Sequence, residues 1–265
     1  MISKRLVLLF SFSFSMALFS CGTFKNGINV FTIDDDIALG KQVSEQIAGD
    51  PKQFPILPEQ GNEEAYRYVR NITTKLLHTG KVAYSKEFPW DVKLINDSKT
   101  LNAFAVPGGH LYVYTGLIKY LDSEDQLAGV MGHEIAHAAL RHSTQQMTSL
   151  YGLDAIRQII TGKTDPGVME QIALGLASLK FSRKHEAQAD EYSVIYLCGT
   201  NYNAAGSAGF FKKIEGKEGT PPEFLSTHPD PGNRIKSIEK KAQELACRGN
   251  ETNKSQYAHI KSLLK

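Results

Sequence analysis

Apolar residues recur at helical spacing in two segments of the first part of the chain. Between residues 34 and 48, and again between 63 and 78, they fall three or four positions apart, which places them on one face of a helix. Gly49-Asp50-Pro51 follows the first segment and is a typical stop signal. The pattern therefore predicts helices over 34–48 and 63–78.

A small β-sheet is expected next. Residues 90–95 alternate between apolar and polar types, and residues 103–106 and 111–114 form two further short apolar runs. Pro107-Gly108-Gly109-His110 separates these two runs and reads as a hairpin turn.

Helical patterns dominate the remainder. Helices are expected over about 123–147, 166–179, 184–197 and from Asp230 to about Ala246. Ser123 and Gln126 have the spacing of a capping box, and Asp230-Pro231 has that of an N-cap followed by a first-turn proline. The prediction is a single α+β domain over 34–265 that is mostly helical, with a loop at 143–165 that is able to act as a lid.

The first twenty residues have a different character. Lys4 and Arg5 precede a run of about 14 apolar residues and serines, which is the layout of a secretory signal peptide over 1–20. The alternative is a retained membrane anchor, but a spanning helix needs about 20 apolar residues. Export of the chain is therefore expected.

Cys21 follows this leader. Leu18-Phe19-Ser20-Cys21-Gly22 resembles the processing site of bacterial lipoproteins, with bulky Phe19 as a departure. That resemblance implies lipidation of Cys21, a tether over 21–33 and, because residue 22 is not Asp, anchoring to the outer membrane, with the domain on the periplasmic side. A stray cysteine beside an ordinary cleavage site is the alternative.

Amino-acid composition limits the classes of function that are expected of this chain. The chain has 265 residues, of which 42% are hydrophobic, and a formal net charge of +2. This is enough apolar material for a sizeable core. The near balance of charge lacks the basic field that nucleic-acid binding requires, so no nucleic-acid partner is expected.

The motif with the clearest chemistry is His133-Glu134-Ile135-Ala136-His137. Residues four apart share one face of a helix, so both imidazoles can reach one metal ion. Glu134 can lean toward the same ion and act as a general base on a water molecule held there. A site with two imidazole ligands, completed by a carboxylate ligand from elsewhere in the chain, favours zinc, and one ion per chain is expected. The pattern indicates a zinc-dependent hydrolase.

A catalytic zinc site needs a third protein ligand. His142 lies five residues after His137 on the expected helix, which turns it away from the shared face and makes it exposed or structural. His110, in the predicted turn, is a candidate for lining the cleft. Glu186 and Asp190 are four apart on a predicted helix and so share one face. One acid of this pair is the stronger candidate for the third ligand.

The chain resembles peptidase family M48, the group that includes the CAAX endopeptidases and HtpX-type heat-shock proteases. The similar segments occur in the family's order and are Asn102–Gly109 with Gly116-Leu117, His133–His137, Ser182-Arg183 with Glu186 and Ala189-Asp190, and Thr227-His228-Pro229 with Arg234. The resemblance implies a zincin-like metallopeptidase domain with a small sheet and an active-site helix.

The resemblance also implies roles at the matched positions. Glu186 would be the third zinc ligand, and Asp190 would orient a ligand imidazole. His228 would stabilise the oxyanion or occlude the idle site, and Arg234 would support the His228 loop. Asn102 and Ala103 would lie on an edge strand that pairs with an extended substrate.

The residues and the resemblance together predict a zinc-dependent metalloendopeptidase, and the resemblance alone implies its substrates, misfolded or misassembled envelope proteins, and hence a role in protein quality control. No apolar run after Cys21 is long enough to span a membrane, so processing of prenylated substrates within the membrane is not expected. One alternative is an envelope lipoprotein with a chaperone-like assembly role and a structural zinc site. Another is a latent enzyme, held closed by His228 or by the loop 143–165.

Two further cysteines, Cys198 and Cys247, fall in predicted C-terminal helices. An exported compartment permits a disulfide between them. Two buried free thiols are the equal alternative.

Overall fold

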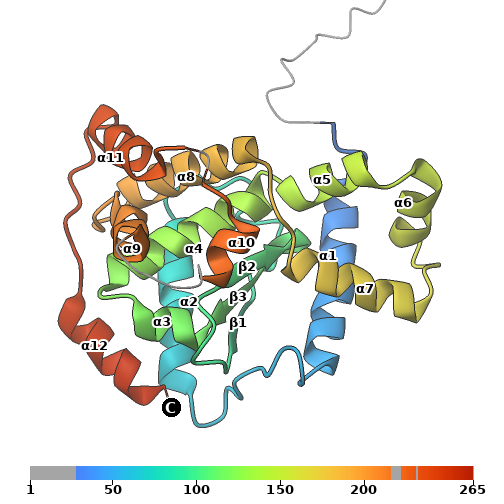
Figure 1. Ribbon diagram of the computed structural model, residues 1–265, viewed down its shortest axis with the longest axis horizontal. Coiled ribbons are helices and arrows are strands. Elements are labelled where there is room, and N and C mark those ends of the chain that lie inside the picture. Colours follow the sequence, from blue (N-terminus) through green and yellow to red (C-terminus); the bar gives the residue numbers. More distant parts are fainter. Residues whose placement is uncertain (1–27, 216–221, 231, 265) are drawn as a thin grey trace, which may run out of the picture.

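The computed structural model describes residues 28–215, 222–230 and 232–264, and the expected signal peptide and Cys21 lie outside them. The chain is a mostly helical α+β protein with a small sheet, as predicted (Figure 1). The strands are β1 (Val92–Ile95), β2 (Ala103–Val106) and β3 (His110–Tyr114). The helices are α1 (Ile33–Gly49), α2 (Glu63–Leu77), α3 (Thr115–Tyr120), α4 (Glu124–Ala139), α5 (His142–Leu150), α6 (Leu153–Ile160), α7 (Pro166–Ala177), α8 (Arg183–Cys198), α9 (Gly206–Glu215), α10 (Glu223–Thr227), α11 (Arg234–Glu244) and α12 (Lys254–Leu263).

The sheet formed by the described residues has the order β1-β3-β2. β3 pairs in parallel with β1 and antiparallel with β2, with Ala103 opposite Val113. The turn between β2 and β3 is the single 3-10 turn Pro107–Gly109, in which Gly108 has a φ of 75° that favours glycine. The expected hairpin is therefore present, and β2 lies at one edge of this sheet.

Both faces of the sheet are buried, and successive strand residues enter different cores. Ala103 and Ala105 of β2 pack with α2, α4, α8 and α9 in the larger apolar cluster. Phe104 and Val106 pack in the second cluster, with α1 and α7, which lie on the other side of the sheet in Figure 1. This alternation follows from the two-residue period of a strand.

Helix α4 lies in the centre of the molecule and is buried on all sides over most of its length. Small residues allow its neighbours to approach closely. A Cβ atom on Gly129 would stand 2.3 Å from the backbone nitrogen of Ser207 at the start of α9. On the adjacent α8, Ser193 Oγ donates a hydrogen bond of 2.7 Å to the Gly129 carbonyl. The interior position of α4 fixes where its polar residues lie.

The helix predicted over 123–147 is wrong at its C-terminal end. α4 ends at Ala139, and Arg141 adopts a left-handed conformation with a φ of 61°. The Arg141 guanidinium donates to Asp36 and to the carbonyls of Phe31 and Thr32, which secures this turn against the start of α1. The segment 143–165, predicted as a loop, contains α5 and α6 instead.

Two predicted helix caps are also corrected. Ser123 Oγ bonds to Asp125 rather than capping α4, and Gln126 accepts from the Asp122 backbone. The helix expected to start at Asp230-Pro231 begins at Arg234, after Asn233 in a left-handed conformation. Local spacing therefore identified both helices and placed the start of α4 correctly, with Ser123 at the N-cap position, but it predicted the wrong capping bonds there and too early a start for α11.

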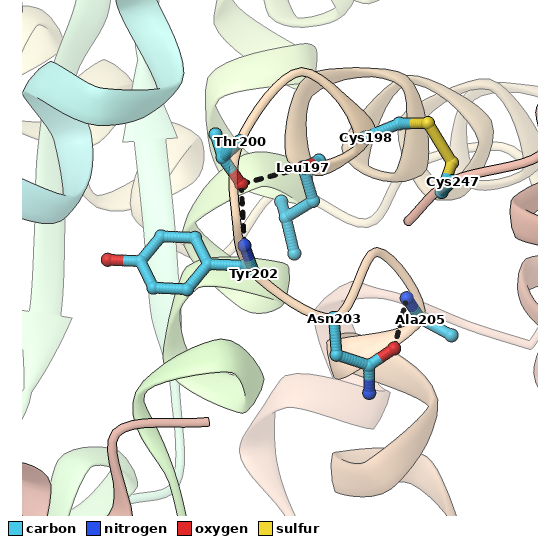
Figure 2. Close-up of a disulfide and its surroundings, with 7 residues drawn as sticks. All are labelled: Leu197, Cys198, Thr200, Tyr202, Asn203, Ala205 and Cys247. Atoms are coloured by element: carbon cyan, nitrogen blue, oxygen red, sulfur yellow. Dashed lines mark hydrogen bonds between the residues drawn. A yellow bond between two sulfur atoms is a disulfide. The ribbon is translucent and has the colours of Figure 1, made fainter. Parts of the chain in front are cut away.

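A disulfide joins Cys198, the last residue of α8, to Cys247, which follows α11 (Figure 2). Their Cα atoms are 5.1 Å apart. Next to it, Thr200 Oγ donates to the Leu197 carbonyl and accepts from the Tyr202 backbone, so the chain turns sharply after α8. The bond ties together the ends of two helices that both contribute to the site described below.

Among the described residues, no helix combines the length and the apolar character needed to cross a membrane.

The disulfide yields a stability prediction. It closes a loop of 49 residues, and such a bond typically stabilises a protein by about 2–4 kcal/mol, mainly by restricting the unfolded chain. The double variant Cys198→Ser/Cys247→Ser should therefore unfold at a lower midpoint of thermal denaturation. The matched control is the unaltered protein under reducing conditions, which should show the same lowering. An unchanged midpoint in both would contradict the stabilising role.

Candidate metal centre and active site

Four buried side chains from three elements converge at one point. His133 and His137 come from α4, Glu186 from α8, and His228 from the end of α10. One potential ligand atom from each lies within 4.8 Å of all the others. The structure thus brings together the two imidazoles and the acid predicted from sequence, with His228, which the resemblance placed near the metal, as a fourth member.

The donor atoms are spaced as metal ligands. His133 Nε2 lies 3.0 Å from His137 Nε2 and 3.3 Å from His228 Nδ1. Glu186 oxygens lie 3.4 Å from the Nε2 atoms of both His133 and His137, and 3.1 Å from His228 Nδ1. Ligand atoms about 2.0–2.1 Å from a tetrahedral ion stand roughly 3.3–3.4 Å apart. The residues present therefore fit a bound metal cation.

The electrostatics of the cluster also favour a cation. Burial opposes charge on His133, but its hydrogen bonds to the carboxylates of Asp190 and Glu186 outweigh it and raise the pKa of His133 to about 9. Burial would raise the pKa of Glu186, yet its bonds to the three histidines hold that pKa well below the usual range. Burial lowers the pKa of His137. The pKa shifts of His133 and Glu186 share one cause: the buried carboxylates favour positive charge at this position.

Asp190 and Arg234 support the cluster from behind. Asp190 Oδ1 lies 2.9 Å from His133 Nδ1, so it can accept the ring N–H and turn Nε2 toward the metal position. Arg234 donates to both oxygens of Asp190, at 3.1 and 2.7 Å, and to Glu186 at 3.3 Å. It also donates to the His228 carbonyl at 3.2 Å. One guanidinium therefore holds two carboxylates and the segment that carries His228.

Glu134 lies beside the cluster without joining it. Glu134 is 3% exposed, and its Oε1 lies 3.5 Å from Nε2 of His228. Neither carboxylate oxygen has a close hydrogen-bond partner among the described residues. Burial raises the pKa of Glu134, and the backbone of Ala105 on β2 acts to lower it, but less strongly. A buried carboxylate left this free is suited to exchanging a proton with a water molecule or substrate.

Asn102 and Ala103 lie at the start of edge strand β2 rather than in the cluster. Asn102 Oδ1 accepts from the Ala103 backbone at 2.9 Å, and its carbonyl accepts from Tyr114 at 3.1 Å. The preceding carbonyl, of Leu101, accepts from the backbone of Phe224 in α10 at 3.1 Å. His110, a candidate for the cleft, lies at the start of β3 beside α1 and outside the cluster.

Sequence reasoning missed three residues that enclose the cluster. Phe181 stacks on His137 with ring centroids 3.9 Å apart, and Phe224 stacks on His228 at 4.3 Å. His142 was expected to be exposed or structural and to point away from His137, but it is 1% exposed and contacts that ring. The error follows from extending α4 through Arg141, where neither glycine nor proline marks the break. Aromatic residues next to the matched motifs were the available signal for the other two.

Comparison with known proteins decides the family. The sequence profile of Peptidase family M48 matches residues 63–242, which is more than half of the chain. The chain belongs to peptidase family M48. The domain described above is therefore a metallopeptidase domain, in agreement with the resemblance noted from its motifs.

Several relatives are similar to this M48 family member. Mitochondrial metalloendopeptidase OMA1 of Arabidopsis thaliana is 30% identical over 151 residues, which is 56% of this chain and 31% of the relative. That of Schizosaccharomyces pombe is 29% identical over 178 residues, 65% of this chain and 52% of the relative. The beta-barrel assembly-enhancing protease of Escherichia coli (strain K12) is 26% identical over 236 residues, 82% of this chain and 46% of the relative. The chain thus spans about a third to a half of the curated relatives it matches.

The geometry predicts that Glu186 is required to hold the metal. Glu186→Gln keeps the shape of the side chain but removes the charge that the three imidazoles face. Loss of a residue that only hydrogen-bonds to a metal ligand typically lowers metal affinity by about 10–100-fold, so loss of the ligand itself should lower it by more than ~100-fold. Metal content per chain after dialysis measures this. Glu191→Gln is the control, because Glu191 lies on the same helix but pairs at the surface with Lys241. Equal metal content in the two variants would contradict the assignment.

Proposed function

We propose that this chain is a zinc-dependent endopeptidase that cleaves unfolded or misassembled proteins of the cell envelope. The observation that carries the proposal is the convergence of His133, His137 and Glu186 beside the buried carboxylate of Glu134, whose oxygens have no close hydrogen-bond partner among the described residues. Two imidazoles and a carboxylate are a ligand set typical of catalytic zinc. The relatives named metalloendopeptidase and protease support the same class of reaction.

Each side chain then has a defined task. Zinc, when bound, lowers the pKa of a coordinated water to about 7 and polarises a carbonyl group. Glu134 accepts the proton of the attacking water and passes it to the leaving amine, a role for which the burial that raises its pKa makes it a stronger base. Asp190 holds the ring of His133, and Arg234 keeps both carboxylates in place.

The arrangement supports a latent state in which His228 occludes the metal position. His228 Nδ1 lies at ligand distance from both His133 and Glu186, whereas a catalytic zinc site keeps one position open. Every residue of β2 is also buried, and α10 is bonded to the carbonyl of Leu101 just before that strand. Figure 1 shows α10 beside β2. Access for a peptide along Asn102 and Ala103 would then require α10 and His228 to move together.

A second candidate function is a lipoprotein with a chaperone-like assembly role and a structural zinc ion. The four-donor arrangement favours it, because structural zinc sites are closed. Glu134 argues against it, since a structural site has no use for a buried carboxylate with no close hydrogen-bond partner among the described residues. The peptidase is therefore the preferred proposal.

Attachment to the outer membrane through Cys21, facing the periplasm, is part of the proposal. Its basis is the leader over 1–20, and the name of the Escherichia coli relative, a beta-barrel assembly-enhancing protease, is compatible with it. The described chain begins at Ile28, seven residues after Cys21, where Asn29 donates to Thr144 of α5. Exposed apolar side chains occur at this beginning, at the last residue of α5 and at the first residue of α6, namely Ile28, Leu150 and Leu153.

Replacing the proposed base gives the decisive test of catalysis. Glu134→Gln should retain one zinc per chain and lose cleavage of casein by at least ~100-fold, because the amide cannot accept the proton. Zinc content and cleavage are measured on the same samples. Wild-type cleavage by Glu134→Gln would rule out the mechanism.

The role of His228 is tested by His228→Ala. If His228 occludes the metal position, the variant should cleave casein faster than the unaltered protein. If His228 stabilises the oxyanion, the variant should cleave it more slowly.

Membrane attachment is tested by Cys21→Ala in the full chain. The unaltered protein should sediment with membranes and incorporate labelled palmitate, and the variant should do neither, because acyl chains contribute about 0.8 kcal/mol per buried CH2 group to membrane binding. Cys198→Ser/Cys247→Ser is the control and should remain labelled. A Cys21→Ala protein that still carries label would contradict lipidation at this residue.

A further inference from the structure

His142 contacts the metal cluster from a side that the mechanism does not use. The left-handed turn at Arg141 brings the first residue of α5 back over the last turn of α4. There His142 Nδ1 lies 3.0 Å from Nδ1 of His137, and both side chains are buried. The Nε2 atom of His137 points the other way, toward His133 and Glu186.

The distance between the two Nδ1 atoms limits where protons can be. Two nitrogen atoms at hydrogen-bond distance share one proton, so one ring donates and the other accepts. A metal takes the lone pair of His137 Nε2, which leaves the ring proton of His137 on Nδ1. His137 therefore donates, and His142 accepts with its own proton on Nε2.

The surroundings hold His142 in this position. Its ring stacks on His185 of α8, with centroids 4.3 Å apart and planes 11° apart. Arg141, immediately before it, is bonded to Asp36 and to carbonyls at the start of α1. Phe181 covers the ring of His137. The acceptor is thus fixed by α1 and α8 as well as by its own helix.

The two imidazoles of α4 are consequently supported in different ways. His133 donates to a carboxylate, Asp190, which Arg234 holds. His137 has an imidazole in the equivalent place. We propose that His142 is a positioning residue for the metal ligand His137: it accepts the Nδ1–H bond and thereby fixes the tautomer and ring orientation that present Nε2 to the metal. This inference rests on the proposed zinc site.

The test distinguishes the effect of losing the hydrogen-bond acceptor of His142 from the effect of losing its stacked ring. In His142→Phe the stack on His185 is kept but the acceptor is lost, and in His142→Asn the side-chain oxygen takes the place of Nδ1. The full chain is purified with detergent present, and its zinc dissociation constant is measured by competition with a chromophoric chelator. His142→Phe should weaken zinc binding by about 10–100-fold, and His142→Asn should restore most of it. His185→Phe, which keeps the stack and leaves the bond intact, should bind zinc as the unaltered protein does.

The midpoint of thermal unfolding of the metal-free proteins is the second readout. It should be the same for His142→Phe and the unaltered chain, because the bond acts on the metal ligand rather than on the fold. If His142→Phe fails to fold, His142→Leu against His142→Asn provides the comparison. Equal zinc affinity with and without an acceptor at this position would overturn the inference alone. An unaltered chain that binds no zinc would overturn the proposed metal site as well.

Discussion

Glu186 and Asp190 place two carboxylates in the interior, where an unpaired charge costs several kcal/mol. Arg234 is buried with them and donates to both, and a proton on His133 or a metal cation supplies the further positive charge. These three residues join α8 to α11, and His133 joins both to α4. The disulfide at the other end of α8 connects the same pair of helices. The centre can be buried because its charges are matched, and the helices that surround it keep their relative positions for the same reason.

The surrounding packing serves this arrangement. α4 is lined by small residues such as Gly129, so α8 and α9 approach closely enough for their side chains to reach those of α4. The sheet is buried on both faces, which places β2 directly against the helix that carries His133 and Glu134. The buried edge strand and His228 are linked through α10, which leads into His228 and whose Phe224 backbone donates to the carbonyl of Leu101, two residues before β2.

Much of the metal centre could be predicted from the sequence, because pairs of its residues lie within one helical turn of each other. Spacing of four on a helix placed His133 with His137 and Glu186 with Asp190, and the structure has both pairs on single helices facing each other. The break at Arg141 was not readable, because its cause is distant: the guanidinium bonds to Asp36 and to carbonyls of Phe31 and Thr32, about a hundred residues earlier. The position of His142 depends on that break. Helices α9, α10 and α12 were likewise missed, since they are short and gain their order from packing.

The sequence by itself determined the helical domain with a small sheet, the zinc-type motif, the family and the residues able to carry charge, because periodicity and motif spacing act within one or two turns of a helix. The tertiary structure decided the contacts that these local patterns leave open. It set His228 beside the three expected ligands, bonded Arg234 to Asp190 and Glu186, chose the disulfide between Cys198 and Cys247 over two free thiols, and turned His142 onto His137. These contacts join residues far apart in the chain or across a turn held by distant partners, and the energy that selects them comes from burial and charge matching in three dimensions.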